Sequence, residues 1–195
     1  MNKRFQIAAI AVALAVASSS SFADESGAFF INGNLGQSSY NSGTITSNHA
    51  FGAAVRGGYS WYSEAWDFGV EAGYVDLGTV RGPVYTVGIP AVTESAKADG
   101  PLLGINLKYK FANQWFVSGR VGYLHTTVDT SLSGGFGSYD FHGNGAYGGV
   151  GVGYDFTKHF GLGLSYDNYR IKYRVIDVNY SGNVGLSSLF AEYRF

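Results

Sequence analysis

The sequence is short of cysteine, proline and charge: it has no Cys and 3 Pro, and charged residues make up 14% of its 195 positions. Small exported domains commonly depend on disulfides, so a chain without cysteine must obtain its stability in another way. The formal net charge of −1 provides no basic excess, which argues against nucleic acid as a partner. The longest apolar run, Ile7–Ala17, is too short for a membrane-spanning helix, and no later window has the period of a long amphipathic helix.

Residues 1–23 have the composition of a cleavable Sec-type signal peptide. A positive start at residues 2–4 precedes the apolar run, and small residues stand at Ser21 and Ala23, where a signal peptidase reads the chain. We expect cleavage after Ala23 and an exported mature chain, residues 24–195, whose length fits one domain.

The chain is rich in glycine and aromatic residues, with 29 Gly, 15 Tyr and 14 Phe. Its apolar residues recur at every second position, which is the period of a strand with one apolar face. The alternating segments are 29–35, 51–61, 68–74, 103–111, 115–123, 150–156, 160–166 and 189–195. The opposite parity carries charges in nearly every segment, as expected for strands between lipid and a polar lumen. The pattern predicts an all-β fold of eight antiparallel strands.

The gaps between these segments alternate in length. The short gaps are Tyr62–Ala65, Ala112–Gln114 and Thr157–His159, and the long ones, rich in Gly, Ser and Thr, lie near 38–49, 79–99, 126–143 and 172–183. Short turns at one end and long loops at the other are typical of a transmembrane up-and-down β-barrel. A soluble barrel of the lipocalin type is the structural alternative, with its apolar face turned inward around a ligand.

Aromatic residues beside the short turns favour the membrane barrel, and all three Trp are among them. They are Trp61, Trp66, Trp115, Phe156 and Phe160, with Phe111 and Phe195 close by. Around a barrel they would form one girdle at one membrane interface, where amphipathic rings prefer to lie. A soluble barrel has no reason to collect them at one end.

The C-terminal stretch SSLFAEYRF places Ala191, Tyr193 and Phe195 on one parity and resembles the signal read by the bacterial barrel-assembly machinery. GVEAGYVDLG at Gly69–Gly78 resembles the third-strand signature of small eight-stranded outer-membrane proteins of the OmpA, OmpX and opacity type. FVSGRVGYL, GVGVGYDF and GLGLSYDNYR are similar to later strands of that family. The resemblance therefore covers the whole mature chain.

The resemblance implies a protein of the Gram-negative outer membrane with both termini in the periplasm. Its implied partners are outer-membrane lipid and lipopolysaccharide and, during biogenesis, the barrel-assembly machinery and periplasmic chaperones. The last strand must then pair with the first, because lipid tolerates no open sheet edge. The family includes anchors, adhesins, serum-resistance proteins and a few enzymes, so it implies no single function.

The charged residues of the polar parity predict a lumen filled by an ionic network. Its candidate members are Arg56, Glu71, Lys108, Arg120, Asp155, Asp167 and Glu192. Counting outward from the short turns gives the opposite pairs Trp61–Trp66, Arg56–Glu71, Asn106–Arg120 and Lys108–Ser118. Opposite charges that face each other on one side of a sheet attract, and in a low-dielectric lumen each needs the other.

Five glycines of the sixth and seventh segments share the inward parity. They are Gly149, Gly151, Gly153, Gly161 and Gly163. They would leave room for the long Arg56, Glu71 and Arg120 side chains. Two interpretations of this lumen are open: a polar core that simply closes the barrel, or a narrow pore for ions or small solutes with Arg56 and Glu71 as its gate.

Three bases, Arg170, Lys172 and Arg174, continue the outward parity of the seventh segment. Counted from Phe160, Arg170 would emerge near the outer headgroups, because a tilted strand crosses the apolar band in about ten residues. Lys and Arg are suited to bind lipopolysaccharide phosphates there. A solvated loop face, or a bulge that reverses the parity, is the alternative explanation.

The second long gap contains the three prolines, Pro83, Pro90 and Pro101, around the apolar stretch VYTVGIPAV. It could extend the barrel as a protruding hairpin, or present a sticky edge to a host or neighbouring-cell surface ligand. A tolerated insertion is the alternative explanation.

The histidines give little support for an enzyme. His49, His125 and His142 lie near the long loops, and His159 lies in a short turn. His125 is followed by two threonines, where lipid A deacylases of this barrel size have His-x-Ser. We predict no catalytic, cofactor or metal site. The expected function is that of a non-enzymatic surface protein, for envelope integrity or attachment through its long loops. A gated pore and a lipid A-modifying enzyme are the alternatives.

Overall fold

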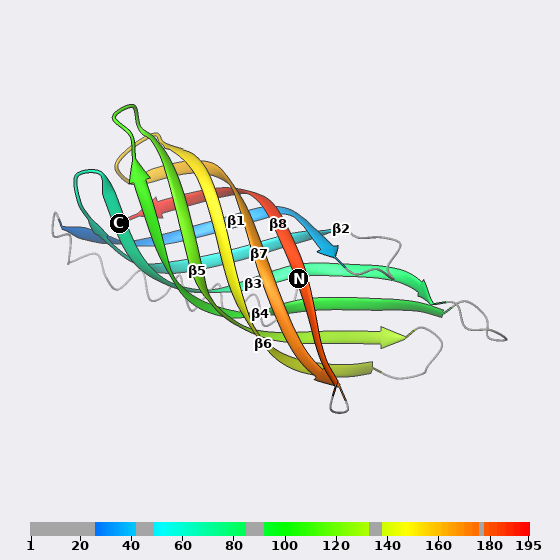
Figure 1. The fold of residues 1–195 in the computed structure, drawn as a ribbon. Coiled ribbons are helices and arrows are strands. Elements are labelled where there is room, and N and C mark those ends of the chain that lie inside the picture. Colours follow the sequence, from blue (N-terminus) through cyan, green and yellow to red (C-terminus); the bar gives the residue numbers. More distant parts are fainter. Residues whose placement is uncertain (1–25, 42–48, 85–91, 133–137, 176–177) are drawn as a thin grey trace.

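The computed structural model of the chain is a closed barrel of eight antiparallel strands (Figure 1). The structure describes residues 26–41, 49–84, 92–132, 138–175 and 178–195. The strands are β1 (Gly27–Asn41), β2 (His49–Tyr62), β3 (Trp66–Val84), β4 (Val92–Lys110), β5 (Trp115–Leu132), β6 (Ser138–Asp155), β7 (Phe160–Val175) and β8 (Val178–Arg194). Within these ranges no helix is long and apolar enough to cross a membrane. The predicted signal peptide lies outside the described residues.

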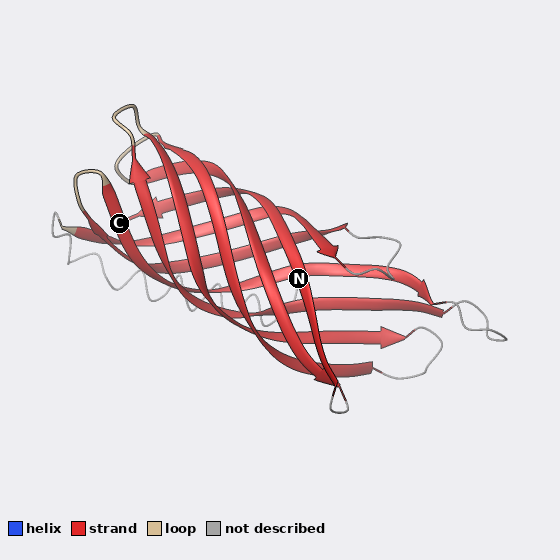
Figure 2. Ribbon diagram, viewed as in Figure 1, coloured by secondary structure: helices blue, strands red, loops and turns tan. Residues whose placement is uncertain are grey.

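Each strand pairs with its sequence neighbours, and β1 also pairs with β8 to close the wall (Figure 1). Strands alone make up this wall (Figure 2). Ile31 lies opposite Tyr193, and the amide of Phe195 donates a hydrogen bond to the carbonyl of Phe29 over 3.0 Å. Gly27 lies opposite Trp61, one residue before the end of β2. The start of β1 and the end of β8 therefore lie together at the short-turn end, as predicted for an even-stranded barrel.

The three short connections lie where the sequence predicted them, at residues 63–65, 111–114 and 156–159. The long connections are different: much of what was predicted as loop is paired strand. The β3–β4 hairpin stays paired as far as Val84 and Val92, and the β5–β6 hairpin as far as Ser131 and Ser138. Strands at this end satisfy their backbone groups by pairing with each other, and this needs no regular apolar face. Alternation of hydrophobicity therefore could not reveal them.

The proline loop is the clearest case of this correction. Pro83 lies in β3 opposite Thr93, and Pro101 lies in β4 opposite Tyr74. Pro90 lies outside the described residues. Among the explanations considered for this segment, the paired strands match the protruding hairpin.

The outer end of the barrel is uneven. Toward the long-connection end, β2 pairs with β3 as far as Ala53 and Asp76, and β6 pairs with β7 as far as Asn144 and Lys172. Strands β3, β4, β5 and β6 remain paired with one another beyond these points, so they form a four-stranded extension of the wall (Figure 1).

A bulge in β3 marks the base of this extension. The register shifts between Asp76 and Thr79, and Gly78 adopts a φ of 79°, which favours glycine. The Asp76 side chain accepts a hydrogen bond from the Gly78 amide over 2.9 Å. Leu77 and Val80 are both buried, so the inward parity changes by one residue across the bulge.

The outer surface of the wall is an apolar belt. Its exposed apolar side chains include Leu35, Phe68, Leu103, Ile105, Val121, Val150, Leu164 and Leu189. The five predicted girdle residues lie at the short-turn end in chains of ring contacts: Trp61 with Tyr59 and Phe68, Trp66 with Tyr109, Trp115 with Tyr154, and Phe156 with Phe160. The apolar parity therefore faces outward, and the polar parity faces the lumen.

Candidate functional site

The centre of the lumen holds four charged side chains that come from four strands. Arg56 Nε lies 3.6 Å from Glu71 Oε1, and Arg56 Nη2 lies 3.7 Å from Asp167 Oδ2. Arg120 Nε lies 3.1 Å from Asp167 Oδ1. Arg56 and Asp167 are fully buried, and Glu71 and Arg120 are exposed by only 3% and 8%. Two bases and two acids balance, so this central layer is neutral.

The register at Arg56 differs from the prediction. Arg56 lies opposite Gly73, Glu71 lies opposite Gly58, and Trp61 lies opposite Phe68. The reason is a tighter turn, since the Ser63 amide donates to the Trp66 carbonyl over 2.8 Å and extends the ladder by one pair. Arg56 and Glu71 still share the inward face, so they pair diagonally. The pairs Asn106–Arg120 and Lys108–Ser118 lie in the predicted register.

Polar groups that the sequence analysis missed complete this layer. Arg56 donates to Asn34 Oδ1 and, over 2.8 Å, to the Tyr169 hydroxyl. The Tyr147 hydroxyl donates to Glu71 Oε1 over 2.7 Å. Tyr147 and Tyr169 share the parity of the inward glycines, so extending that parity along β6 and β7 would have identified them.

A second ionic layer lies nearer the short turns. Lys108 Nζ lies 2.6 Å from Glu192 Oε1, and Arg194 Nε lies 3.0 Å from the same oxygen. Arg194 also forms an ion pair with Asp155. The predicted network is therefore divided into two layers, and Arg194 is a member that the prediction omitted.

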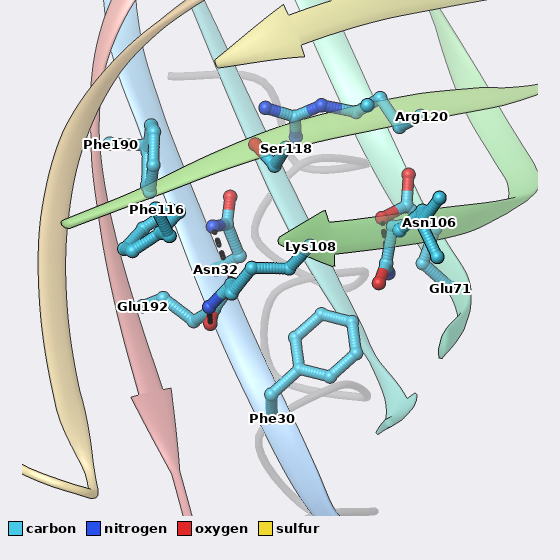
Figure 3. A pocket seen from close by; sticks show the side chains of 12 residues that line it. Phe30, Asn32, Glu71, Asn106, Lys108, Phe116, Ser118, Arg120, Phe190 and Glu192 are labelled. Carbon is cyan, nitrogen blue, oxygen red and sulfur yellow. Dashed lines mark hydrogen bonds and ion pairs between the residues drawn. The ribbon is translucent and has the colours of Figure 1, made fainter. Parts of the chain in front are cut away.

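A small hollow of about 30 Å³ lies between the two layers (Figure 3). Phe30, Phe116 and Phe190 line it together with Asn32 and the charged groups around it. In Figure 3 the Lys108 amine meets Glu192 on one side, and Asn106 meets Glu71 on the other. A hollow of this size holds about one or two waters and no larger solute.

The outer half of the lumen is mainly apolar, which the sequence analysis did not predict. Its buried residues are Ala54, Val75, Leu77, Ala98, Leu102, Leu124, Tyr147, Tyr169, Ile171, Val184 and Leu186. The rings of Tyr147 and Tyr169 stack with centroids 5.9 Å apart and separate this apolar layer from the ionic layer. The lumen is therefore filled by ionic and apolar layers, so the predicted ionic network is present but fills only part of it.

The glycines of β6 and β7 do not chiefly make room for Arg56, Glu71 and Arg120. A Cβ added at Gly149 would meet the Asp167 carboxylate, and one added at Gly153 would meet the Phe116 ring. Gly151, Gly161 and Gly163 would meet Ser118, Asp155 and Phe190 in the same way. The room left by the glycines is taken by other side chains of the neighbouring strands.

A sequence model described as the outer membrane protein β-barrel domain matches residues 9–195. The chain belongs to this outer-membrane β-barrel family. No curated protein matches the sequence. Three solved structures with the same fold are OprG from Pseudomonas aeruginosa, Ail from Yersinia pestis and the Neisserial surface protein NspA. OprG is 15% identical with a TM-score of 0.59 and coverage of 87% of this chain and 96% of its own. Ail is 16% identical with a TM-score of 0.52 and coverage of 87% of this chain and 97% of its own. NspA is 12% identical with a TM-score of 0.52 and coverage of 86% of this chain and 97% of its own.

Membership of the family gives the barrel its place and orientation. The protein lies in the outer membrane, as predicted from the resemblance. In such barrels the short turns face the periplasm and the longer connections face outward. The four-stranded extension of β3 to β6 then lies on the extracellular side.

Each histidine side chain that the structure describes contacts a different residue. His49 contacts Ser39, His125 contacts Asn144 over 2.8 Å, and His159 contacts the Arg194 carbonyl over 2.9 Å. The side chain of His142 lies outside the described residues. Within the described ranges, no group of three His, Cys, Asp or Glu side chains could hold a metal ion.

The three outer bases keep the outward parity of β7. Arg170 is exposed and lies between Ala146 of β6 and Asn183 of β8. Lys172 and Arg174 follow at outward register positions, and their side chains lie outside the described residues. At the other end of the barrel, Tyr193 and Phe195 are exposed on the belt beside Ala191.

Proposed function

We propose that this outer-membrane barrel is a non-conducting, non-enzymatic surface protein that acts through its extracellular hairpins, in attachment or in envelope integrity. The observation that carries the proposal is the filling of the lumen. Two ionic layers and one apolar layer occupy it along its axis, and the hollow between the ionic layers is about 30 Å³. An eight-stranded barrel has an interior only just wide enough for its own side chains.

The filling also argues against Arg56 and Glu71 as a simple gate. If their contact broke, Arg56 would keep Asp167 and the Tyr169 hydroxyl as partners. The apolar layer above them would still block the path, because Leu77, Leu124 and Leu186 are fully buried there. A pore would need the rearrangement of several strands' side chains rather than one ion pair.

The extracellular side offers the surface that the proposal requires. Paired strands hold the β3–β6 extension in a defined shape beyond the belt, and loops on a rigid scaffold commonly carry function. Two proteins of the same fold are named for such roles: Ail is an attachment invasion locus protein, and NspA is a surface protein. Ail has also been crystallised with the heparin analogue sucrose octasulfate, which makes a sulfated glycan a sensible first probe.

The first test is conductance in planar bilayers of the purified protein, of Glu71→Ala and of the control Glu64→Ala in a short turn. We expect silence from all three. Discrete current steps from the wild type would overturn the proposal. Steps from Glu71→Ala alone would mean that the Arg56–Glu71 pair closes a pore, and the gated-pore alternative would replace the proposal.

The second test concerns attachment. A host strain displaying the protein is compared with one displaying a variant whose β3–β4 tip, residues 85–91, is replaced by a Gly-Ser linker of equal length. We expect the variant to keep heat-modifiable gel migration and to lose adhesion to heparin-coated surfaces or to cultured epithelial cells. An attachment role would be contradicted if the strain with the wild-type protein, the strain with the variant and the empty host all adhered equally to heparin and to the cells. Increased detergent sensitivity of cells lacking the protein would then favour envelope integrity.

A further inference from the structure

The outward face of β7 changes from apolar to basic over a short distance. Leu164 is 61% exposed, Tyr166 follows at 49%, and Asn168 and Arg170 are exposed above them. Ten residues separate Phe160, in the short-turn girdle, from Arg170. At a rise of about 3.3 Å per residue and a tilt of about 40°, this corresponds to about 25 Å along the membrane normal. That is the height of the apolar belt of such barrels, so Arg170 lies at the outer headgroups.

Tyr166 supports this boundary independently. A Cβ added at Gly185 of β8 would lie 2.6 Å from the Tyr166 hydroxyl, so the ring leans across β8 toward the outer rim. Gly185 lies opposite Asn168, two residues further out than the register partner of Tyr166. An aromatic ring in the belt with its hydroxyl toward the rim is typical of a membrane interface.

The neighbours of Arg170 are small or polar. The flanking outward residues of the described wall are Asn144, Ala146 and Gly148 on β6, and Ser181, Asn183 and Gly185 on β8, and none of them is acidic. Arg170 therefore lies on a floor of short side chains, with no carboxylate beside it in these positions. A ligand of headgroup size can reach the guanidinium from outside.

One row further out, a polar line crosses four strands. His125, Asn144, Lys172 and Ser181 occupy successive register positions on β5, β6, β7 and β8. His125 and Asn144 are joined by a contact of 2.8 Å between Nδ1 and Oδ1. This row adds hydrogen-bonding groups and a second basic position next to Arg170.

The opposite side of the rim differs in charge. Asp76 and Asp99 lie opposite each other on β3 and β4, and Lys97 Nζ lies 2.7 Å from Asp76 and 3.7 Å from Asp99. Lys97 on that side is therefore paired with two acids. An anion at the outer headgroups is attracted to the β7 side rather than to the β3 side.

We propose that the outward face of β5 to β8 around Arg170 is a binding site for the phosphorylated headgroup of an outer-leaflet glycolipid. Arg170 binds a phosphate, with Lys172 and Arg174 at register positions along the same strand. Asn183, Ser181 and the His125–Asn144 pair supply partners for sugar hydroxyls. The site is separate from the hairpin tips that carry the proposed surface function, so either proposal can fail without the other.

The test uses the full protein, extracted from membranes and reconstituted in phosphatidylcholine nanodiscs. The discs contain diphosphoryl lipid A, dephosphorylated lipid A or phosphatidylglycerol at equal mole fraction, and native mass spectrometry counts the retained lipid. The variants are Arg170→Gln, Arg170→Lys and, as a matched control, Lys158→Gln in a short turn at the other membrane face. Heat-modifiable gel migration confirms that each variant is folded.

We expect the wild type and Lys158→Gln to retain diphosphoryl lipid A in preference to both other lipids. Arg170→Gln should lower that retention about fivefold, the change expected for one base near a lipid surface, and Arg170→Lys should restore part of it. Equal retention by Arg170→Gln and wild type would overturn the proposal. Equal retention of phosphatidylglycerol would mean unspecific attraction to anionic lipid, and displacement by equimolar inorganic phosphate would mean an anion site. Either result would also overturn it.

Discussion

The substitution Asp167→Asn tests whether the central ionic layer stabilises the barrel. Asp167 is fully buried, and two guanidinium groups lie at 3.1 Å and 3.7 Å from its carboxylate. Its two carboxylate oxygens have no hydrogen-bond partner in the described structure, so these ion pairs are its main compensation for lost hydration. At an effective dielectric constant of about 20, the two contacts correspond to gross attractions of about 5 and about 4 kcal/mol.

The net loss of stability caused by Asp167→Asn should be smaller than the sum of these two gross attractions. Removing one partner of a buried ion pair typically costs about 3–5 kcal/mol, because the remaining charge stays buried without compensation. We therefore expect Asp167→Asn to lower the free energy of unfolding by about 3–5 kcal/mol, measured by reversible urea unfolding in lipid vesicles with tryptophan fluorescence. The double variant Asp167→Asn/Arg120→Gln restores charge balance and should recover at least half of this loss.

The matched control is Asp76→Asn on the outer rim. Asp76 has a shorter contact, 2.7 Å to Lys97, but both side chains are more than 20% exposed. Exposed ion pairs contribute about 0–1 kcal/mol, so this control should change stability by less than 1 kcal/mol. If Asp167→Asn behaves like Asp76→Asn, the central layer is not a stabilising network and the reasoning is wrong.

Two further predictions follow from close packing and from the chain's last residue. Gly149→Ala should cost about 1–3 kcal/mol in the same urea assay, since its Cβ would meet the Asp167 carboxylate, whereas Gly33→Ala, with open space around its Cβ, should be nearly neutral; equal effects would contradict this packing. Phe195→Ala should lower the amount of heat-modifiable protein in cell outer membranes while leaving refolding in vesicles nearly unchanged. A normal cellular yield would exclude Phe195 as an assembly signal.

The sequence predicted the barrel well because lipid imposes a simple pattern on its wall. Outward residues such as Leu103, Ile105 and Leu107 must be apolar at every second position, and short turns leave little freedom between strands. The same pattern placed the lumen charges on the inward face. It could not place Arg56 against Glu71 correctly, since one extra ladder pair at Ser63 and Trp66 changes the register without changing the parity.

Two other features left no trace in the alternation. The outer hairpins lie in segments rich in Gly, Ser and Thr, so their strands looked like loops. In the outer half of the lumen, Leu77, Leu124 and Leu186 are inward but apolar, because side chains that pack only against one another need no charge. The contacts of Tyr147 and Tyr169 with the ionic layer depend on partners from distant strands, and no local pattern contains that information.

The bulge in β3 has a consequence for how this wall tolerates mutation. Along most of each strand, residues alternate between two environments, the lipid outside the barrel and the packed side chains inside it. Tolerance of a polar substitution should therefore oscillate with a period of two residues. In β3 the oscillation should change phase at Gly78, because Leu77 and Val80 both face inward across the register shift. In a complete substitution scan of β3, the tolerated positions would therefore change from one parity to the other at the bulge.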